Sequence, residues 1–187
     1  MTVEERVRVV PTFKPELASF NMGSINFSIH PIAARYKDED FKYDWEKPYL
    51  EMTKDFVFKN TFSELEHFCK TMRENRTRPE HEMYEVGHLY NTAFLLREGL
   101  LEPPLYMQFV MGVLGSIMPT IDNVIHMKKV ADELFGKDKY NWSVIGVGYP
   151  EEFRIGTLAV MMGGHVRVGL EDNLSLIHIS EPTRPLY

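Results

Sequence analysis

The sequence has little of several features that would place a protein in a class at once. Of its 187 residues only Cys69 is a cysteine, so no disulfide can form within the chain and a reducing compartment is favoured. No apolar run approaches the ~20 residues that cross a bilayer, and the start, MTVEERVRVV, carries acids where a secretory signal would be basic and then apolar. The formal net charge of -6 offers no basic surface for nucleic acid. We expect a cytoplasmic protein that binds neither nucleic acid nor membrane.

What is present is typical of one folded domain, with 44% hydrophobic and 26% charged residues. Five segments have the composition of strands, namely residues 17–22, 80–85, 105–111, 142–147 and 165–170. Helical patterns separate most of them, and such alternation indicates parallel strands. The chain has no glycine-rich nucleotide-binding signature, which argues against a dinucleotide fold. A βα barrel needs eight strands and about 250 residues. We therefore predict an α/β fold that is a partial (β/α)8 TIM barrel, about strands 4 to 8, within residues 1–173.

The helices are predicted from caps and apolar spacing. Thr61 and Glu64 form a capping box, in which each side chain can accept a hydrogen bond from a free backbone N–H at the helix start. Apolar residues then recur at helical spacing and predict buried faces: Leu65, Phe68, Cys69 and Met72; Leu89, Ala93 and Leu96; Ile121, Val124, Ile125, Ala131, Leu134 and Phe135. A last helix is expected over residues 151–162.

Two segments do not follow the alternation. Residues 36–60 form a long polar and aromatic insertion between the first strand and its helix. On a barrel this loop would lie on the active face and could be a substrate lid, but a surface excursion or an oligomer contact is an equal alternative. Residues 174–187, LSLIHISEPTRPLY, match the translation of a sequencing adapter and are interpreted as an artefactual tail rather than a native strand.

The stretch GGHVRVGLEDN, residues 163–173, is the most informative one. Arg167 lies in the middle of a predicted strand, and Glu171 and Asp172 lie at its end. In an extended strand Arg167 and Glu171 would be about 13 Å apart, unless Gly169 permits a bend. Taken alone, a structural pair of arginine and acid is the simpler interpretation. The position at the carboxyl end of the last strand favours chemistry instead, because barrel enzymes react there.

Two earlier segments carry further polar candidates. In EHEMYE, Glu80, Glu82 and Tyr84 would share one face, and burying these acids inside a barrel is costly without a cationic or metal partner. On a solvent-facing strand the same residues would indicate no function. The first strand ends in LASFNMGSINF, where the side chains or backbone of Ser19, Asn21, Gly23 and Ser24 could bind a carboxylate. Ordinary turn chemistry would give the same residues.

Successive blocks of the sequence resemble the β-keto acid cleavage enzymes, the group that includes 3-keto-5-aminohexanoate cleavage enzyme. The blocks lie in family order and cover nearly all of residues 1–173: KPELASFNMGSINF, PEHEMYEVGH, PPLYMQFVMGVLGS, WSVIGVG and GGHVRVGLEDN. The resemblance implies a zinc-dependent (β/α)8 barrel, a homo-oligomer, that condenses a β-keto acid with acetyl-CoA. The product is then cleaved to acetoacetate and a new acyl-CoA.

The resemblance also implies roles for particular residues. Glu171 would bind zinc, and Arg167 and Asp172 would form the dyad that deprotonates the keto acid. Ser19 would contact the substrate carboxylate, and Glu82 would lie in the pocket as a further catalytic residue. Arginine suits an anionic substrate site because it stays charged at any relevant pH.

The sequence departs from the family pattern at two points. No His-x-His motif, the source of the family's other zinc ligands, occurs in the chain, and GYPEEF at residues 148–153 stands where many relatives have an arginine after the glycine. We therefore expect a barrel fragment that is inactive by itself. The alternatives are a metal-dependent keto-acid aldolase or lyase that does not use CoA, and a non-catalytic barrel that binds carboxylates.

Overall fold

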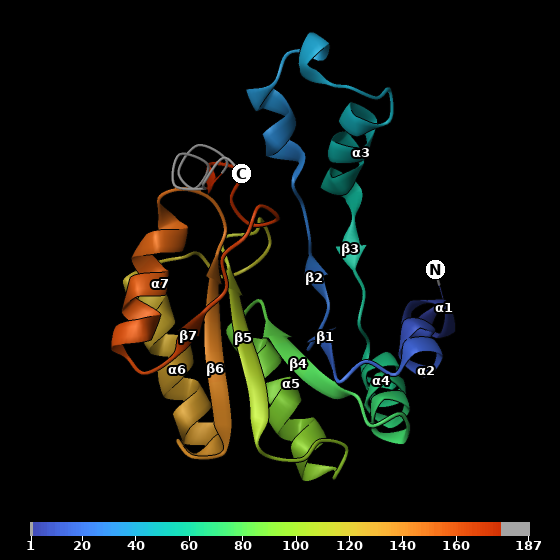
Figure 1. Ribbon diagram of the computed structural model, residues 1–187, viewed down its shortest axis with the longest axis vertical. Coiled ribbons are helices and arrows are strands. Elements are labelled where there is room, and N and C mark those ends of the chain that lie inside the picture. The colour runs from blue at the N-terminus through green and yellow to red at the C-terminus, as the bar shows by residue number, and fades with distance from the viewer. Residues whose placement is uncertain (1, 177–187) are drawn as a thin grey trace, which may run out of the picture.

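The computed structural model describes residues 2–176, and its centre is a sheet of five parallel strands (Figure 1). Across the sheet the strands follow chain order: β1 (Leu17–Asn21), β4 (Arg78–Met83), β5 (Leu105–Met111), β6 (Tyr140–Gly146) and β7 (His165–Val166). Every neighbouring pair is parallel. The prediction of an α/β fold with the parallel strands of a partial barrel is confirmed. Within the described residues the sheet is open and does not close into a barrel.

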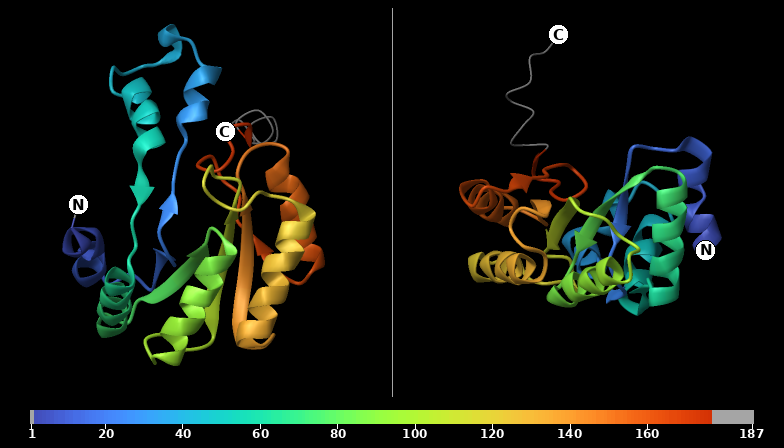
Figure 2. Two further views of the ribbon diagram at one scale, coloured as in Figure 1. Left: turned by 180° about the vertical axis from the view of Figure 1, so that it is seen from behind. Right: turned by 90° about the horizontal axis from the view of Figure 1, so that it is seen from below.

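Helices connect the strands, as the alternating pattern predicts. They are α4 (Phe62–Glu74), α5 (Val86–Arg97), α6 (Ile121–Phe135) and α7 (Glu151–Met161), and two short helices, α1 (Val3–Val7) and α2 (Val9–Phe13), precede β1. Seen from below in Figure 2, α4, α5 and α6 lie in a row along one side of the sheet. No helix in the described part of the chain combines the length and apolar content that a membrane span requires.

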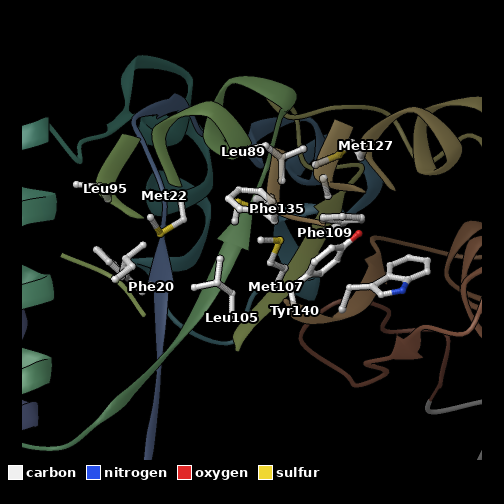
Figure 3. Packing of buried hydrophobic residues seen from close by; sticks show 14 of the residues in the cluster. Phe20, Met22, Leu89, Leu95, Leu105, Met107, Phe109, Met127, Phe135 and Tyr140 are labelled. Atoms are coloured by element: carbon white, nitrogen blue, oxygen red, sulfur yellow. The ribbon is translucent and has the colours of Figure 1, made fainter. Parts of the chain in front are cut away.

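The two faces of the sheet differ in chemistry because side chains alternate along each strand. On the helix side, Met83, Met107 and Phe109 are fully buried and pack in one cluster with helix residues such as Leu89 and Met127 (Figure 3). The opposite face carries polar residues in register: Glu82 pairs with Gln108, and Gln108 with Ser143. The apolar face stabilises the fold, and the polar face is available to form a functional site.

The predicted helix faces are confirmed in part. The capping box at Thr61 is present, and Leu65, Phe68, Cys69 and Met72 are all buried. On α6 the prediction was wrong for Ile121 and Ile125, which are 57% and 45% exposed, and correct for Val124, Ala131 and Phe135. The buried face of α6 is formed by Val124, Met127, Val130, Ala131 and Phe135. Where apolar residues flank both sides of a helical stripe, packing against the sheet decides which side is buried.

A long arm, residues 25–58, leaves the sheet between β1 and α4. Its base is an antiparallel pair of β2 (Ile25–Asn26) and β3 (Val57–Phe58). Between these strands lie η1 (His30–Arg35), η2 (Asp38–Asp40), α3 (Glu46–Met52) and η3 (Thr53–Asp55). In Figure 1 the arm extends beyond the carboxyl ends of the sheet strands. The predicted insertion at 36–60 thus lies mostly in an arm that starts earlier. Of the predicted tail, residues 177–187 lie outside the described residues.

Candidate active site at the carboxyl ends of the strands

Arg167 follows β7 directly and is the centre of a cluster of charged side chains. Its backbone N–H still donates to the Val144 carbonyl of β6 at 3.0 Å. Its Nη2 lies 3.2 Å from Asp172 Oδ2 and 3.3 Å from Glu171 Oε2. The predicted strand over 165–170 is too long, because β7 ends before Arg167. The alternative of a bend at Gly169 is the one found, since the Asp172 N–H donates to the Gly169 carbonyl at 3.1 Å. The bend brings all three charged groups together.

The turn over residues 169–173 is anchored by a buried carboxylate that the sequence analysis missed. Glu152, on the first turn of α7, is 0% exposed and accepts a hydrogen bond from Asn173 Nδ2 at 2.7 Å. Its other oxygen accepts from the Gly169 N–H at 3.4 Å. The Gly148 N–H donates to the Asp172 carbonyl at 2.8 Å. The turn that carries the charged cluster is therefore held from α7 and from the end of β6.

Gln108 links the arginine to the polar face of the sheet and was also missed. This side chain is 1% exposed, and its Oε1 accepts from Arg167 Nη1 at 3.2 Å. Its Nε2 donates to Glu80 Oε1 at 3.1 Å and to Ser143 Oγ at 3.2 Å. The sequence did carry one signal for Gln108, because it is the one amide inside the apolar run LYMQFVM. A buried amide needs hydrogen-bond partners, so such a residue can be expected to contact other polar groups.

Glu82 reaches the same cluster from β4. Its Oε1 lies 3.9 Å from Arg167 Nη1, and the Tyr84 hydroxyl donates to its Oε2 at 3.1 Å. Burial raises the pKa of Glu82 above its ordinary value, although the Tyr84 hydrogen bond and the Arg167 charge oppose this. The Glu82 carboxyl therefore holds a proton more readily than an exposed glutamate does.

Asp172 is the carboxylate held most closely by the arginine. Its side chain is only 8% exposed, whereas that of Glu171 is 85% exposed. Burial raises the pKa of Asp172, and the Arg167 ion pair and hydrogen bonds act in the opposite direction. A carboxylate with a raised pKa is a stronger base than an ordinary one, and the arginine keeps it ionised and oriented.

The four residues predicted to bind a carboxylate at the end of β1 separate into two pairs. Ser19 and Asn21 line a cavity of about 190 Å³ together with Glu82. Ser19 Oγ donates to Glu80 Oε2 at 3.1 Å. Asn21 is 7% exposed, and its Oδ1 has no hydrogen-bond partner within the described residues.

Gly23 and Ser24 have local structural roles instead. A Cβ on Gly23 would come within 2.6 Å of the His88 ring, so the turn needs glycine for close packing. Ser24 Oγ accepts from the Asn60 N–H at 2.8 Å near the base of the arm. The structure does not place Gly23 or Ser24 in the network of Arg167.

Glu171 was predicted to bind zinc, and the side chains around it do not complete such a site. Among residues 2–176 there is no group of three or more His, Cys, Asp or Glu side chains that could hold a metal ion. The neighbour of Glu171 is the Arg167 guanidinium, which is a cation. A tight zinc site takes three or four protein ligands, so the described residues do not fit zinc by themselves.

A sheet of parallel strands with an arginine and several acids gathered at the carboxyl ends is the arrangement of a βα-barrel enzyme acting on small molecules. The chain belongs to the beta-keto acid cleavage enzyme family, whose model matches residues 1–182. The family resemblance stated from the motifs is confirmed.

Relatives with established names cover most of the chain. It is 45% identical over 174 residues to 3,5-dioxohexanoate:acetyl-CoA acetone transferase of Paraburkholderia graminis, a match that covers 93% of this chain and 55% of the relative. It is 29% identical to 3-keto-5-aminohexanoate cleavage enzyme of Acetoanaerobium sticklandii, covering 93% and 52%. The chain therefore spans about half the length of these relatives.

A solved structure supports the fold. The complex of ObcA with oxaloacetate matches with a TM-score of 0.54 and 18% identity, covering 86% of this chain and 36% of ObcA. At that identity the match shows a shared fold, and no function is carried over from it.

Proposed function

We propose that this chain provides the Arg167–Asp172 part of an acyltransferase that condenses a β-keto acid with acetyl-CoA and releases acetoacetate and a new acyl-CoA. The observation that carries the proposal is the 3.2 Å pair of Arg167 and Asp172 on an anchored turn at the carboxyl ends of the strands. Family membership and the acetyl-CoA-dependent names of the relatives agree with it.

Asp172 is proposed to act as the base. Its carboxylate accepts a proton from the carbon next to the keto group, and the electrons of that C–H bond remain on the substrate as an enolate. A raised pKa brings Asp172 closer to the pH at which it works, which makes proton transfer more favourable. Arg167 keeps the base ionised and places positive charge beside the forming anion.

Ser19 and Asn21 are proposed to recognise the substrate carboxylate, with Glu82 as a further residue of the pocket. Both β1 residues line the same cavity as Glu82, and Asn21 is buried without a partner for its Oδ1. A carboxylate only accepts hydrogen bonds, so it would be bound by the Ser19 hydroxyl and the Asn21 Nδ2 amide, and Asn21 Oδ1 would accept from a donor elsewhere on the ligand. Gly23 and Ser24 would contribute only through the shape of the turn.

The described residues supply one of the metal ligands that the proposed enzyme needs. Glu171 remains a proposed zinc ligand, but no step is assigned to zinc because the described residues do not make up a metal site. We propose that this chain by itself does not catalyse the reaction, since a single exposed carboxylate cannot hold a metal tightly. Acetoacetate formation by the isolated chain with added zinc would contradict this.

The substrate class is proposed from the P. graminis relative, whose name specifies 3,5-dioxohexanoate. The test is a chimera in which residues 1–173 replace the matching segment of that relative. We expect it to form acetoacetate from 3,5-dioxohexanoate only when acetyl-CoA is present. Turnover without acetyl-CoA would support the aldolase or lyase alternative instead.

Asp172→Asn in the chimera is expected to lower kcat by roughly 10²–10⁴-fold, the usual contribution of a positioned general base. Asp138→Asn, a change on the α6–β6 connection, is the control and should leave kcat unchanged. An Asp172→Asn chimera with full activity would favour a non-catalytic, carboxylate-binding role for this turn.

We also propose an assembly state and a location. The family resemblance implies a homo-oligomer, and the arm exposes Tyr43, Trp45 and Tyr49 at 50%, 62% and 48%. The molar mass of the chimera in solution tests this. A cytoplasmic location is proposed from the single cysteine, Cys69, which is buried as a free thiol.

A further inference from the structure

A second cavity lies at the amino ends of the strands, away from the Arg167 cluster. Its volume is about 300 Å³. The starts of β1, β4 and β5, the last turns of α4 and the connection between α5 and β5 form its walls. Among its lining residues are His81, Thr77 and three arginines, Arg73, Arg76 and Arg78.

His81 presents an unused hydrogen-bond acceptor. The side chain is 2% exposed, and its Nδ1 lies 2.9 Å from the Tyr106 carbonyl. Because a carbonyl only accepts, Nδ1 carries the proton and Nε2 has a free lone pair in the neutral ring. Burial lowers the pKa of His81 to about 4, so the ring is neutral at physiological pH. Nε2 has no partner within the described residues.

Thr77 adds a second unsatisfied group to the wall of the cavity. Its side chain is 4% exposed, and its Oγ1 also has no partner among the described residues. An unsatisfied buried polar group costs about 1–3 kcal/mol. Two of them lining one cavity indicate a partner molecule that donates a hydrogen bond to His81 and can bond to Thr77.

The arginines of the cavity supply positive charge. Arg73 is already engaged, because it donates to the Gly99 carbonyl at 2.7 Å and lies 3.6 Å from Glu102. Arg76 and Arg78 make no ion pair within residues 2–176. Arg76 also has a φ of 58°, at the end of α4 where glycine is usual. Strain of this kind at a non-glycine residue is typical of ligand-binding positions.

From the two unsatisfied groups and the two uncommitted guanidinium groups, we propose that the cavity binds a small hydroxycarboxylate. Its carboxylates would pair with Arg76 and Arg78, and its hydroxyl would donate to His81 Nε2 and accept from Thr77 Oγ1. His81 and Glu82 are neighbours in β4, so their side chains point to opposite faces of the sheet. The cavity therefore lies across the sheet from the Arg167 cluster and is a second site, independent of the proposed reaction.

The test compares malate with succinate, two dicarboxylates that differ by one hydroxyl. NMR titration of the amide signals of Thr77 and Arg78 gives Kd for each probe with the whole chain. We expect malate to bind at least 10-fold more tightly than succinate. His81→Phe should remove this preference, because it leaves no acceptor for the hydroxyl. Arg78→Gln should weaken both probes several-fold, and Arg35→Gln, a change on the arm, should weaken neither.

Several results would overturn the proposal: equal Kd values for malate and succinate in the wild type, a preference that survives His81→Phe, or inorganic phosphate that binds more tightly than malate. Thermal unfolding checks that each variant is folded. If His81→Phe does not fold, the nearly isosteric Thr77→Val takes its place. It should weaken malate more than succinate, and equal weakening would count against the site.

Discussion

At the scale of single residues, Arg167 shows how several polar partners stabilise a partly buried charge on the polar face of the sheet. Its guanidinium meets Gln108, Asp172 and Glu171 within 3.3 Å and Glu82 at 3.9 Å. A partly buried arginine is tolerated only when such partners offset its loss of hydration. The same contacts fix the orientation of Asp172, so the interactions that make the arginine acceptable also prepare the base.

Glu82→Gln tests the effect of burial on this cluster. The folded-state pKa of Glu82 is raised above its unfolded value, chiefly by burial. Its contribution to stability is therefore fully present below the unfolded pKa and is lost as pH rises through the folded pKa. We expect the free energy of unfolding of Glu82→Gln, relative to wild type, to increase as pH rises from about 4.3, the ordinary pKa of glutamate, through the raised folded-state pKa. Urea denaturation across this range measures it.

The control for this experiment is Glu74→Gln, at the exposed end of α4. This variant should follow the wild-type pH dependence. If Glu82→Gln instead lost stability relative to wild type as pH rises, the Arg167 charge would outweigh burial at this position.

At the scale of elements, the turn over residues 169–173 depends on α7. Glu152 and Asn173 are 0% and 2% exposed and meet at 2.7 Å, and two other contacts, to Gly169 and Gly148, hold the same turn. A loop that carries reacting groups needs such support, because a displacement of about 1 Å can cost 10²-fold in rate. The stability of the turn and the geometry of Arg167 and Asp172 are therefore linked.

Asn173→Asp should break this anchor, since it places a carboxylate against the buried carboxylate of Glu152. We expect a loss of about 1.5–3 kcal/mol at neutral pH, the usual value of a hydrogen bond to a charged group. Adding Glu152→Gln should recover part of the loss by restoring a donor and an acceptor. Equal stability of Asn173→Asp and wild type across pH would contradict the anchor.

The start of α4 gives a second test at this scale. Thr61 Oγ1 accepts from the Glu64 N–H, and Glu64 Oε2 accepts from the Thr61 N–H at 2.7 Å. Thr61→Ala removes one half of this box and should lower the free energy of unfolding by about 0.5–2 kcal/mol. Ser63→Ala, in the same helical turn and exposed, is the control and should change it by less than about 0.5 kcal/mol.

At the scale of the whole molecule, the arrangement of the sheet could be predicted from periodicity and from the order of the motifs. Alternating apolar segments and capped helices are local signals, and they located β1, β4, β5 and β6 to within two residues at most ends. The charged residues Arg167, Glu171 and Asp172 could be named because the sequence places an arginine inside the predicted last strand and two acids at its end.

Features that depend on distant contacts could not be predicted. Gln108 and Arg167 are 59 positions apart, and Glu152 and Asn173 are 21 apart, and no local pattern links either pair. The end of β7 after Val166 was missed because the alternation continues through Leu170. Hydrogen bonds of the turn, rather than side-chain pattern, end the strand there. Residues that hold a site in place are thus harder to find from sequence than those that form it.

The sequence alone left three equal interpretations of the segment that forms most of the arm: a substrate lid, a surface excursion or an oligomer contact. The arm rises from the same end of the sheet as the Arg167 cluster (Figure 1). Its link to the body includes the Ser28 N–H, which donates to the Leu114 carbonyl at 3.1 Å. Because Ile25 and Phe58 are paired across an antiparallel bridge, an Asn-Gly turn can replace residues 27–56 without separating the two sides.

We expect this shortened chain to keep the five-stranded sheet, because the buried cluster on the helix side contains no residue between 27 and 56. Amide NMR signals of β4, β5 and β6 should keep their shifts, with changes confined to Asn60 and the loop around Leu114. A matched variant with the turn inserted after Gly99 should leave the sheet signals unchanged too. Collapse of the sheet on removal of the arm would show that the arm is part of the folding unit.

If the sheet persists, the same deletion in the chimera distinguishes a lid from an oligomer contact. Removal of a lid from the active face lowers kcat/KM, whereas removal of an interface between subunits lowers the molar mass of the assembly.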